Sequence, residues 1–149
     1  MVSPDSLTVV NYHVATGPAQ EIERIVSWIF AEGFEGSPTD SAAVHYSDVD
    51  AKVYGLVDAE RALFAGAVVI DAGRNLAELR RIAARRDMRR QGLGGRLLTA
   101  VEADLAASGT SKLEVCAYAS AAGFYDKLGY TRDDAYCDVV SFYKQLAIS

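Results

Sequence analysis

The stretch Arg89-Arg90-Gln91-Gly92-Leu93-Gly94-Gly95 lies between a predicted strand and a predicted helix, and it decides how the rest of the chain is interpreted. Residues 76–84 ahead of it are predicted to form the strand, and apolar residues recur at helical spacing over 93–105 behind it. The first backbone N–H groups of a helix have no partner within the helix, and glycine has no Cβ to keep an anion away from them. The stretch therefore predicts a helix start that binds a phosphate group.

Two other phosphate-binding glycine motifs do not fit this spacing. A dinucleotide-binding GxGxxG that began at Gly92 would need glycine at position 97, which is Leu97, and the Gly-Lys-Ser/Thr of a P-loop is absent. The pattern that fits is Arg/Gln-x-x-Gly-x-Gly/Ala, with Arg89, Gly92 and Gly94 at its fixed positions. In this form the stretch resembles the pyrophosphate-binding motif of the GNAT acyltransferase superfamily.

A second segment, AAGFYDKLGY at 121–130, resembles the A-x-x-F-Y-x-K-x-G-F/Y segment of the same superfamily. The resemblance extends over about residues 76–130. It implies a GNAT-like α/β fold, with a mixed, mostly antiparallel sheet of six or seven strands flanked by about four helices, in a single N-acetyltransferase domain over 1–149. The activity implied is that of an acetyl-CoA-dependent N-acetyltransferase, which moves an acetyl or short acyl group from acetyl-CoA, its co-substrate, to a primary amine by direct attack.

Residue patterns place the elements in the order strand, helix, strands, helix, strand, helix, strands, and no repeat or linker divides the chain. Helices are predicted from Pro18 to residue 33, from Leu93 to about Ser108, and over 121–128. Residues 34–49 are predicted to form an irregular loop. Strands are predicted over 7–14, 52–57, 62–70, 76–84, 113–117, 130–131 and 139–146.

Charge is segregated along this chain of net charge −5. Between Leu79 and Arg96, seven arginines and one aspartate give a segment charge of +6, so the rest of the chain carries −11. The acidic total disfavours non-specific nucleic-acid binding, and arginines around a phosphate site would attract the phosphates of a cofactor. The arginines are Arg80, Arg81, Arg85, Arg86, Arg89, Arg90 and Arg96.

The two cysteines, Cys116 and Cys137, have no CxxC or histidine spacing around them, so we predict reduced thiols in or near the core and no metal site. The N-terminus lacks a basic stretch followed by an apolar run. No window holds the roughly 18 uncharged apolar residues of a membrane helix. We therefore expect a soluble, cytoplasmic protein without a membrane partner.

The resemblance also assigns cofactor-binding residues. It places the pyrophosphate on main-chain N–H groups in the glycine-rich stretch, and it pairs the pantetheine arm with the backbone of the strand before that stretch. Tyr118 stands where many relatives carry asparagine, and Ser120 is a candidate replacement hydroxyl as well as a predicted helix N-cap. The implied cofactor-binding residues are Ile82, Ala83, Ala84, Arg89, Arg90, Gln91, Gly92, Leu93, Gly94, Gly95, Ser120 and Phe124.

For the chemistry, the resemblance implies Tyr125 as the general acid for the departing thiolate and Glu78 as the general base for the amine. Both residues have ordinary structural alternatives. Tyr125 is also a typical core tyrosine, and Glu78 could be a surface residue paired with Arg80 while ordered water takes the proton. A strand amide near residues 82–84 would stabilise the acyl oxygen.

The sequence leaves the acceptor open between a small-molecule amine and a protein amine. Acidic residues in 34–49 and 132–138 favour a cationic amine. An acyl-CoA-binding regulatory module without turnover is the alternative function, and the strand-rich C-terminus offers a surface for a homodimer. His13 and His45 are isolated in the sequence and are predicted to be structural or surface histidines.

Overall fold

The computed structural model describes residues 6–33, 50–85, 92–136 and 139–146. Within these ranges the chain forms one sheet of seven strands, three α-helices and one short 3-10 helix. The elements are β1 (Thr8–His13), α1 (Ala19–Gly33), β2 (Ala51–Val57), β3 (Leu63–Gly73), β4 (Leu76–Ala84), α3 (Leu93–Ala107), β5 (Lys112–Tyr118), η3 (Ala119–Ala121), α4 (Ala122–Lys127), β6 (Thr131–Tyr136) and β7 (Val139–Gln145).

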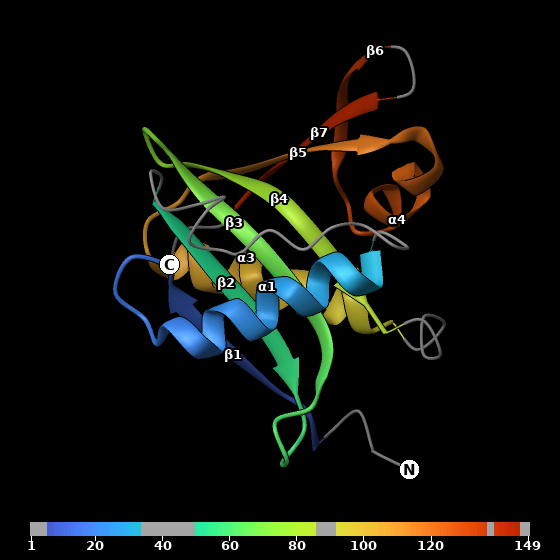
Figure 1. Cartoon of the computed structure of the whole chain (residues 1–149). Helices are drawn as coiled ribbons and strands as arrows, with labels where there is room; N and C mark the ends of the chain where they lie inside the picture. The colour runs from blue at the N-terminus through green and yellow to red at the C-terminus, as the bar shows by residue number, and fades with distance from the viewer. Residues whose placement is uncertain (1–5, 34–49, 86–91, 137–138, 147–149) are drawn as a thin grey trace.

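The strands follow the order β1-β2-β3-β4-β5-β7-β6 across the sheet. Every neighbouring pair is antiparallel except β4 and β5, which are parallel and are connected through α3. A parallel pair needs such a crossover, whereas β2, β3 and β4 follow one another through tight turns. Figure 1 shows α1 in front of the sheet and α3 behind it, with α4 beside the last strands.

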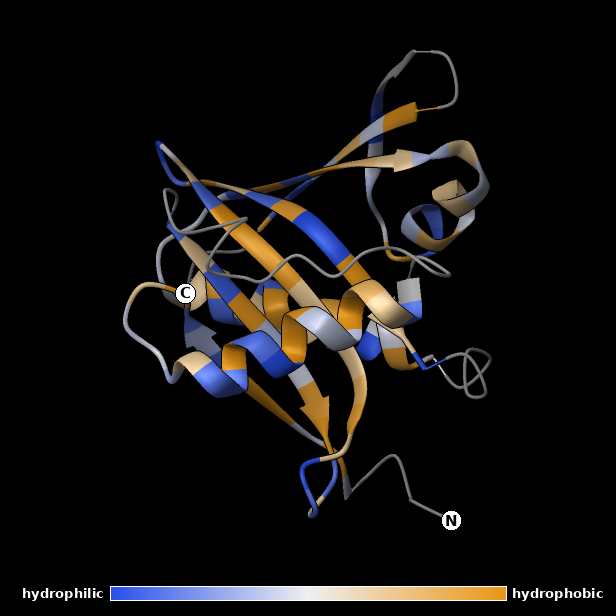
Figure 2. Ribbon diagram, viewed as in Figure 1, coloured by the Kyte–Doolittle hydropathy of each residue, from blue (hydrophilic) through white to orange (hydrophobic). Residues whose placement is uncertain are grey.

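Helix α1 packs directly on the backbone of the central strands. Its apolar stripe is fully buried at Ile25, Val26 and Ile29, each with at most 1% of its surface exposed. A Cβ added to Gly66 of β3 would lie 2.7 Å from Ile29 Cγ1, so glycine at this position allows the helix to approach the strand. Figure 2 shows the hydrophobic strands behind this helix.

Helix α3 covers the opposite face of the sheet, and a second, larger core lies there. Leu93, Leu97, Leu98 and Val101 are buried in it, together with residues of β5, β7 and α4. The apolar residues whose spacing predicted this helix are therefore the residues that pack in the core. Because α4 shares this core, the short helix is held against β5 and β7.

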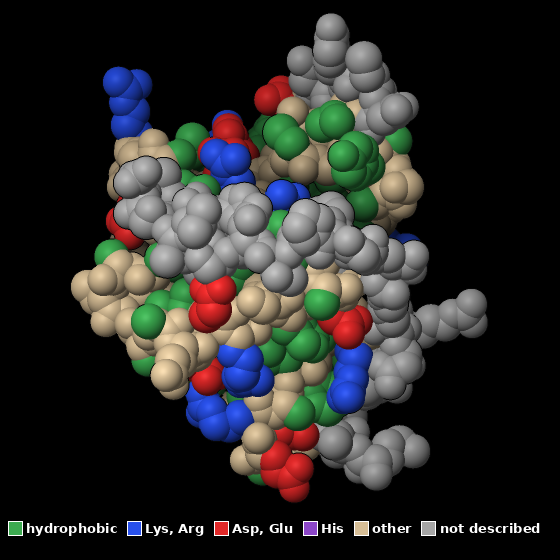
Figure 3. Space-filling model, in the orientation of Figure 1, with side chains coloured by type: hydrophobic (Ala, Val, Ile, Leu, Met, Phe, Trp, Pro, Cys, Tyr) green, Lys and Arg blue, Asp and Glu red, His purple; other side chains and the backbone are tan. Residues whose placement is uncertain are grey.

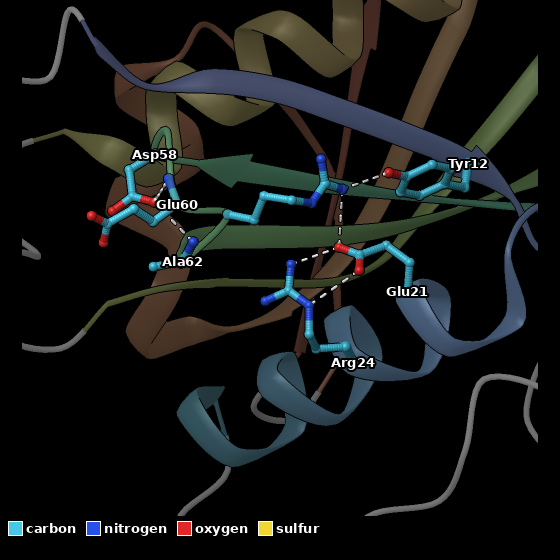
Figure 4. A network of polar contacts seen from close by, with 7 residues as sticks. Tyr12, Glu21, Arg24, Asp58, Glu60 and Ala62 are labelled. Atoms are coloured by element: carbon cyan, nitrogen blue, oxygen red, sulfur yellow. Dashed lines mark hydrogen bonds and ion pairs between the residues drawn. The ribbon is translucent and has the colours of Figure 1, made fainter.

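A polar network closes the end of the sheet where β2 turns into β3 (Figure 4). Arg61 lies in the turn with φ of 66° and donates hydrogen bonds to Tyr12 Oη on β1 at 2.9 Å and to Glu21 Oε1 on α1 at 3.3 Å. Arg24 donates to the same carboxylate at 2.6 Å. The pKa of Glu21 is lowered, mainly by the Arg24 hydrogen bond against a smaller opposing effect of burial. The network joins β1, α1 and the turn.

Most predicted elements are confirmed, and residues 76–84 form a strand with the predicted limits. The described residues contain three α-helices where about four were predicted, and the loop predicted over 34–49 lies outside them. The strand predicted at 130–131 is wrong in extent, because β6 continues to Tyr136. Its run of charged residues disfavours a strand locally, but backbone pairing with β7 extends it, with an irregularity between Arg132 and Asp134.

Candidate functional site

Strand β4 has one fully paired edge and one edge that opens. On the β3 side the pairing runs from Leu76 to Ala84. On the β5 side it covers four residues and ends where Leu79 faces Val115. Beyond that point, no strand among the described residues pairs with this edge of β4. The residues that the resemblance assigned to the pantetheine arm, Ile82, Ala83 and Ala84, therefore lie on the part of β4 that is no longer paired with β5.

A β-bulge coincides with the separation. Leu79 faces Val69 and Arg81 faces Val68, so Arg80 is an extra residue on β4. The bulge changes which face of the sheet the following side chains occupy. Ala77 and Leu79 lie in the α3 core before it, whereas Ala83 lies in the α1 core after it. An insertion of one residue thus redirects the whole end of the strand.

A cleft of about 450 Å³ occupies the space between the diverging strands. It is lined from three sides, by the ends of β4 and β5 and by the η3–α4 segment with the start of β7. Two predicted site residues, Ile82 and Tyr125, are in this lining. The lining residues are Leu79, Arg80, Arg81, Ile82, Val115, Cys116, Ala117, Tyr118, Ala121, Tyr125 and Val139.

Tyr125 is the buried polar side chain of this cleft. Only 4% of the residue is exposed, and burial raises the pKa of its phenol to about 12. Its ring packs at 5.0 Å from the ring of Phe124, 5.6 Å from that of Tyr130 and 5.3 Å from that of Phe142. None of the hydrogen bonds among the described residues involves its hydroxyl, in contrast to Tyr130, whose hydroxyl donates to Glu102 Oε2 at 2.7 Å.

The Tyr125 hydroxyl is not one of the enclosed polar atoms without a partner among the described residues, so its oxygen reaches the open space of the cleft, where a ligand or water can bind it. The sequence alternatives for Tyr125 were an acid at the thioester and an ordinary core tyrosine. Its burial alone would suit either, but its unbonded hydroxyl in a cleft is the feature that an ordinary core tyrosine would lack.

The start of α3 lies against α4 through two glycines. A Cβ on Gly94 would be 3.3 Å from Phe124 Cε1 and 3.8 Å from Ala84 Cβ, and one on Gly95 would be 3.3 Å from Leu128 Cδ2. These contacts give both glycines a packing role in addition to the anion approach expected from the sequence. The structure therefore brings Ala84, Leu93, Gly94, Gly95 and Phe124 together beside the cleft.

Gly92 is the N-cap of α3 and has φ of 71°, a conformation that favours glycine. It has no side chain to cap the helix, so the N–H groups of the first turn are available to an anion. A Cβ at this position would meet no described atom within 4 Å, so the left-handed backbone conformation, rather than lack of space, favours glycine here. Arg89, Arg90 and Gln91 lie outside the described residues.

Glu78 and Arg80 form an ion pair on β4, with Arg80 Nε 3.4 Å from Glu78 Oε1. The Glu78 side chain is 36% exposed and precedes the cleft, whose lining begins at Leu79. Its partner in register on β5 is Glu114, which is itself paired with Lys112 at 3.3 Å. The ion pair with Arg80 is the structural alternative to a role of Glu78 as general base, and Glu78 is not among the residues that line the cleft.

Two sequence-based expectations near the cleft are corrected. Ser120 is not a helix N-cap: it lies inside η3, and the N-caps are Tyr118 for η3 and Ala121 for α4, because the chain enters α4 through a 3-10 turn. Cys116 is not a core thiol but is exposed, since it points away from the core that holds its neighbour Val115.

The sequence contained part of the information needed to place Cys116 and Tyr118 in the cleft. The alternation of β5 places Val115 in the core and therefore Cys116 and Tyr118 on the opposite face. Tyr118 is 65% exposed and faces Val139, which is 37% exposed, on β7. These two side chains form an apolar rim on the cleft, and Figure 3 shows hydrophobic side chains gathered over this end of the sheet.

Two of the seven arginines between Leu79 and Arg96 contact other parts of the protein outside the cleft. The Arg85 guanidinium lies 4.6 Å from the centre of the Phe64 ring, and Arg96 Nη2 donates to the carbonyl of Leu7 at 2.9 Å. His13 is exposed, and its Nδ1 lies 4.0 Å from a carboxylate oxygen of Asp50. His45 and Cys137 lie outside the described residues.

The described helices include none that is both long enough and apolar enough to cross a membrane. In the same part of the chain, no three His, Cys, Asp or Glu side chains are grouped so that they could hold a metal ion.

The GNAT acetyltransferase domain family matches residues 49–132, which is more than half of the chain. The match includes the whole cleft except its β7 side. No curated protein matches the sequence at a significant level.

Solved structures share the fold along nearly the whole chain. A GNAT-family acetyltransferase from Staphylococcus aureus is 13% identical with a TM-score of 0.70, covering 94% of this chain and 99% of that one. The ribosomal-protein-S18-alanine N-acetyltransferase from Escherichia coli is 19% identical with a TM-score of 0.67, covering 95% and 96%. A GNAT-family acetyltransferase from Elizabethkingia anophelis, solved with acetyl-CoA bound, is 16% identical with a TM-score of 0.68, covering 95% and 99%.

Proposed function

The chain belongs to the GNAT family of acetyltransferases, and we propose that it transfers an acetyl or short acyl group from acetyl-CoA to a primary amine in the cleft between β4 and β5. Family membership supports acyl transfer from acetyl-CoA in general. The amine acceptor and the roles of individual residues are the part that we propose.

The observation that carries the proposal is the open edge of β4 with the unbonded Tyr125 hydroxyl beside it. Beyond Leu79, no described strand pairs with this edge of β4, so the edge can accept an amide-containing chain such as the pantetheine arm. Ile82 lines the cleft on this side. Ala83 and Ala84 contribute backbone groups, since their side chains pack into the two cores. The same edge supplies an amide for the acyl oxygen.

At the other end of the cofactor, the pyrophosphate would bind the main-chain N–H groups of Arg90 to Gly95, and Arg89 would be a further cofactor-binding residue. The left-handed Gly92 and the uncapped helix start support this assignment. Phe124 then has two contacts, one with Gly94 and one with Tyr125. Through these contacts the phosphate-binding end and the reacting end of the site are held in a fixed relation.

Tyr125 is proposed to act on the departing sulfur. The thiol of free cysteine has a pKa near 8.5, and burial raises the pKa of the Tyr125 phenol to about 12, so complete proton transfer from this phenol to a thiolate is uphill. A hydroxyl that stays protonated at neutral pH is, however, a permanent hydrogen-bond donor. We therefore assign to Tyr125 a hydrogen bond that strengthens as negative charge develops on the sulfur, rather than an early proton transfer.

Proton removal from the attacking amine is proposed to involve Glu78 or a water bound beside it. The Glu78 carboxylate is paired with Arg80 and lies just ahead of the cleft. This position favours transfer of the amine proton to a water molecule rather than directly to Glu78. Glu78 and Glu114, side by side in register, would also attract a cationic amine. For Ser120, exposed in η3, we propose a peripheral contact with the cofactor.

The test is thermal unfolding of the full chain with acetyl-CoA and with longer acyl-CoAs, followed by thiol release over a panel of amines. We expect acetyl-CoA to raise the unfolding temperature, because a ligand that binds only the folded state stabilises it. Thiol release should then depend on one class of amine. Stabilisation without turnover on any amine would favour the regulatory acyl-CoA-binding module instead, and absence of stabilisation by every acyl-CoA would refute both.

A further inference from the structure

Cys116 is a free thiol in the cleft, and the acyl transfer proposed above gives it no role. It lies on β5 one residue beyond Val115, the last residue that pairs with β4. Its side chain is exposed and lines the cleft. A thiol therefore stands at the point where the two strands separate.

The immediate surroundings of Cys116 leave its sulfur accessible. Its neighbours Val115 and Ala117 are directed toward the α3 core, so Cys116 occupies the opposite face of β5. There its Sγ lies 3.5 Å from Ser141 Oγ on β7. A thiol is a weak donor and a weak acceptor, and a contact of this length does not prevent its reaction.

An independent feature of the same cleft indicates that a ligand enters here. Tyr125 is 96% buried and its hydroxyl makes no hydrogen bond to another described residue. Under the proposed function, the ligand atom that approaches this hydroxyl is the sulfur of coenzyme A. The cleft would then bring the sulfur of a bound cofactor to the region that contains the thiol of Cys116.

We propose that Cys116 is a site of covalent modification by coenzyme A, through thiol–disulfide exchange with coenzyme A disulfide bound in the cleft. The Cys116 thiolate attacks one sulfur of the bound disulfide, whose S–S bond breaks as the bond from Cys116 to that sulfur forms. The other half leaves as a thiolate and takes up one proton, which balances the proton lost by Cys116. The products are a Cys116–coenzyme A mixed disulfide and one coenzyme A thiol, and no further oxidant is required.

The modification would inactivate the protein reversibly. A coenzyme A moiety tethered at Cys116 occupies the space that the thioester of acetyl-CoA needs, and a small thiol reductant would release it by the reverse exchange. The inference rests on the proposed function, because it requires the cleft to accept the pantetheine end of the cofactor.

The experiment treats the full chain with coenzyme A disulfide and, in parallel, with oxidised glutathione, a disulfide without the nucleotide. Intact mass and peptide mapping follow the adduct in the wild type, in Cys116→Ser and in Cys137→Ser as the matched control. We expect one adduct on Cys116 in the wild type and in Cys137→Ser, formed at least about tenfold faster from coenzyme A disulfide, because binding raises the effective concentration of the reacting sulfur. Acetyl-CoA should slow the reaction, and dithiothreitol should reverse it.

Equal rates with the two disulfides, an adduct that maps elsewhere, or a lack of protection by acetyl-CoA would overturn the inference. Peptide mapping of the wild-type adduct gives this answer even if Cys116→Ser does not fold. Stabilisation by acetyl-CoA, measured separately, distinguishes the two failures. If acetyl-CoA stabilises the chain but Cys116 is not labelled, only this inference fails, whereas absence of stabilisation refutes the proposed function and this inference together.

Discussion

The two edges of β4 differ although they belong to the same nine-residue strand. The β3 edge is paired along the strand, and Gly66 and Ala83 face each other near its end, where Ala83 packs in the α1 core. The β5 edge is paired only from Leu76 to Leu79 and then borders a cleft. One edge is thus paired within the sheet, and the other borders the cleft in which we propose the site.

The comparison shows how a site can be opened without unfolding the sheet that carries it. The bulge at Arg80 allows β4 to stay paired with β3 while it turns away from β5. The two cores pack on the faces of the strand on both sides of the bulge, so β4 stays anchored where its pairing with β5 has ended. Stability and function should therefore respond to different substitutions on either side of β4.

The largest effect is expected on the open side, from Tyr125→Phe. Loss of a hydrogen-bond donor to the departing sulfur should lower kcat by about 10²–10³-fold. The free energy of unfolding should stay within about 0.5 kcal/mol, because the hydroxyl has no hydrogen bond to lose within the described protein. Steady-state kinetics with the amine found in the panel, together with urea unfolding, measure both quantities.

The binding of acetyl-CoA provides the control for Tyr125→Phe. The ring that packs against Phe124 and Phe142 is kept, so the dissociation constant should change little. An unchanged kcat, or a loss of binding as large as the loss of turnover, would refute the role assigned to Tyr125.

On the side of β4 that is paired with β3, Gly66→Val should lower the free energy of unfolding and leave the cleft intact. Even a Cβ would come within 2.7 Å of Ile29 Cγ1, so the larger side chain must displace α1. Overpacking of this kind costs about 1–3 kcal/mol. Chemical unfolding measures the loss, and the affinity of the folded fraction for acetyl-CoA should be unchanged.

Gly123→Ala is the matched glycine control for Gly66→Val. Gly123 lies in α4, and a Cβ there meets nothing within 4 Å. Alanine should stabilise the helix by about 0.5–1 kcal/mol relative to glycine. If both substitutions destabilised equally, the close approach of α1 at Gly66 would not be the reason for the first effect.

The sequence predicted the strand β4 and the helices around it better than it predicted the difference between the two edges of β4. The strand 76–84 and the apolar stripe of α3 follow from local periodicity, and the resemblance placed Tyr125 on a short helix near the strand ends. The bulge could not be predicted in this way. Arg80 and Arg81 are two ordinary strand-edge residues without a glycine or proline to mark an insertion, and the register is set by pairing with β3.

The errors at Ser120 and Cys116 have the same origin. Ser120 fits an N-cap by residue type, but a 3-10 turn shifts the start of α4 past it. Cys116 fits a core by residue type, but the divergence of β5 from β4 and the absence of a described helix over this face expose it. Both depend on tertiary geometry that begins where the β4–β5 pairing ends.

A last substitution, Tyr130→Phe, sharpens the comparison between two neighbouring tyrosines. Unlike that of Tyr125, the Tyr130 hydroxyl is bonded, to Glu102 of α3, whose other oxygen accepts from Lys144 Nζ at 3.0 Å. Loss of a hydrogen bond to a partly buried carboxylate should cost about 1.5 kcal/mol of unfolding free energy. Turnover should remain within about threefold of the wild type, because this hydroxyl is held by the scaffold and does not line the cleft. Urea unfolding and steady-state kinetics, measured for Tyr130→Phe and Tyr125→Phe side by side, test this difference. If both variants lost turnover, or both lost stability, the Tyr130 hydroxyl would not be purely structural and the Tyr125 hydroxyl purely functional.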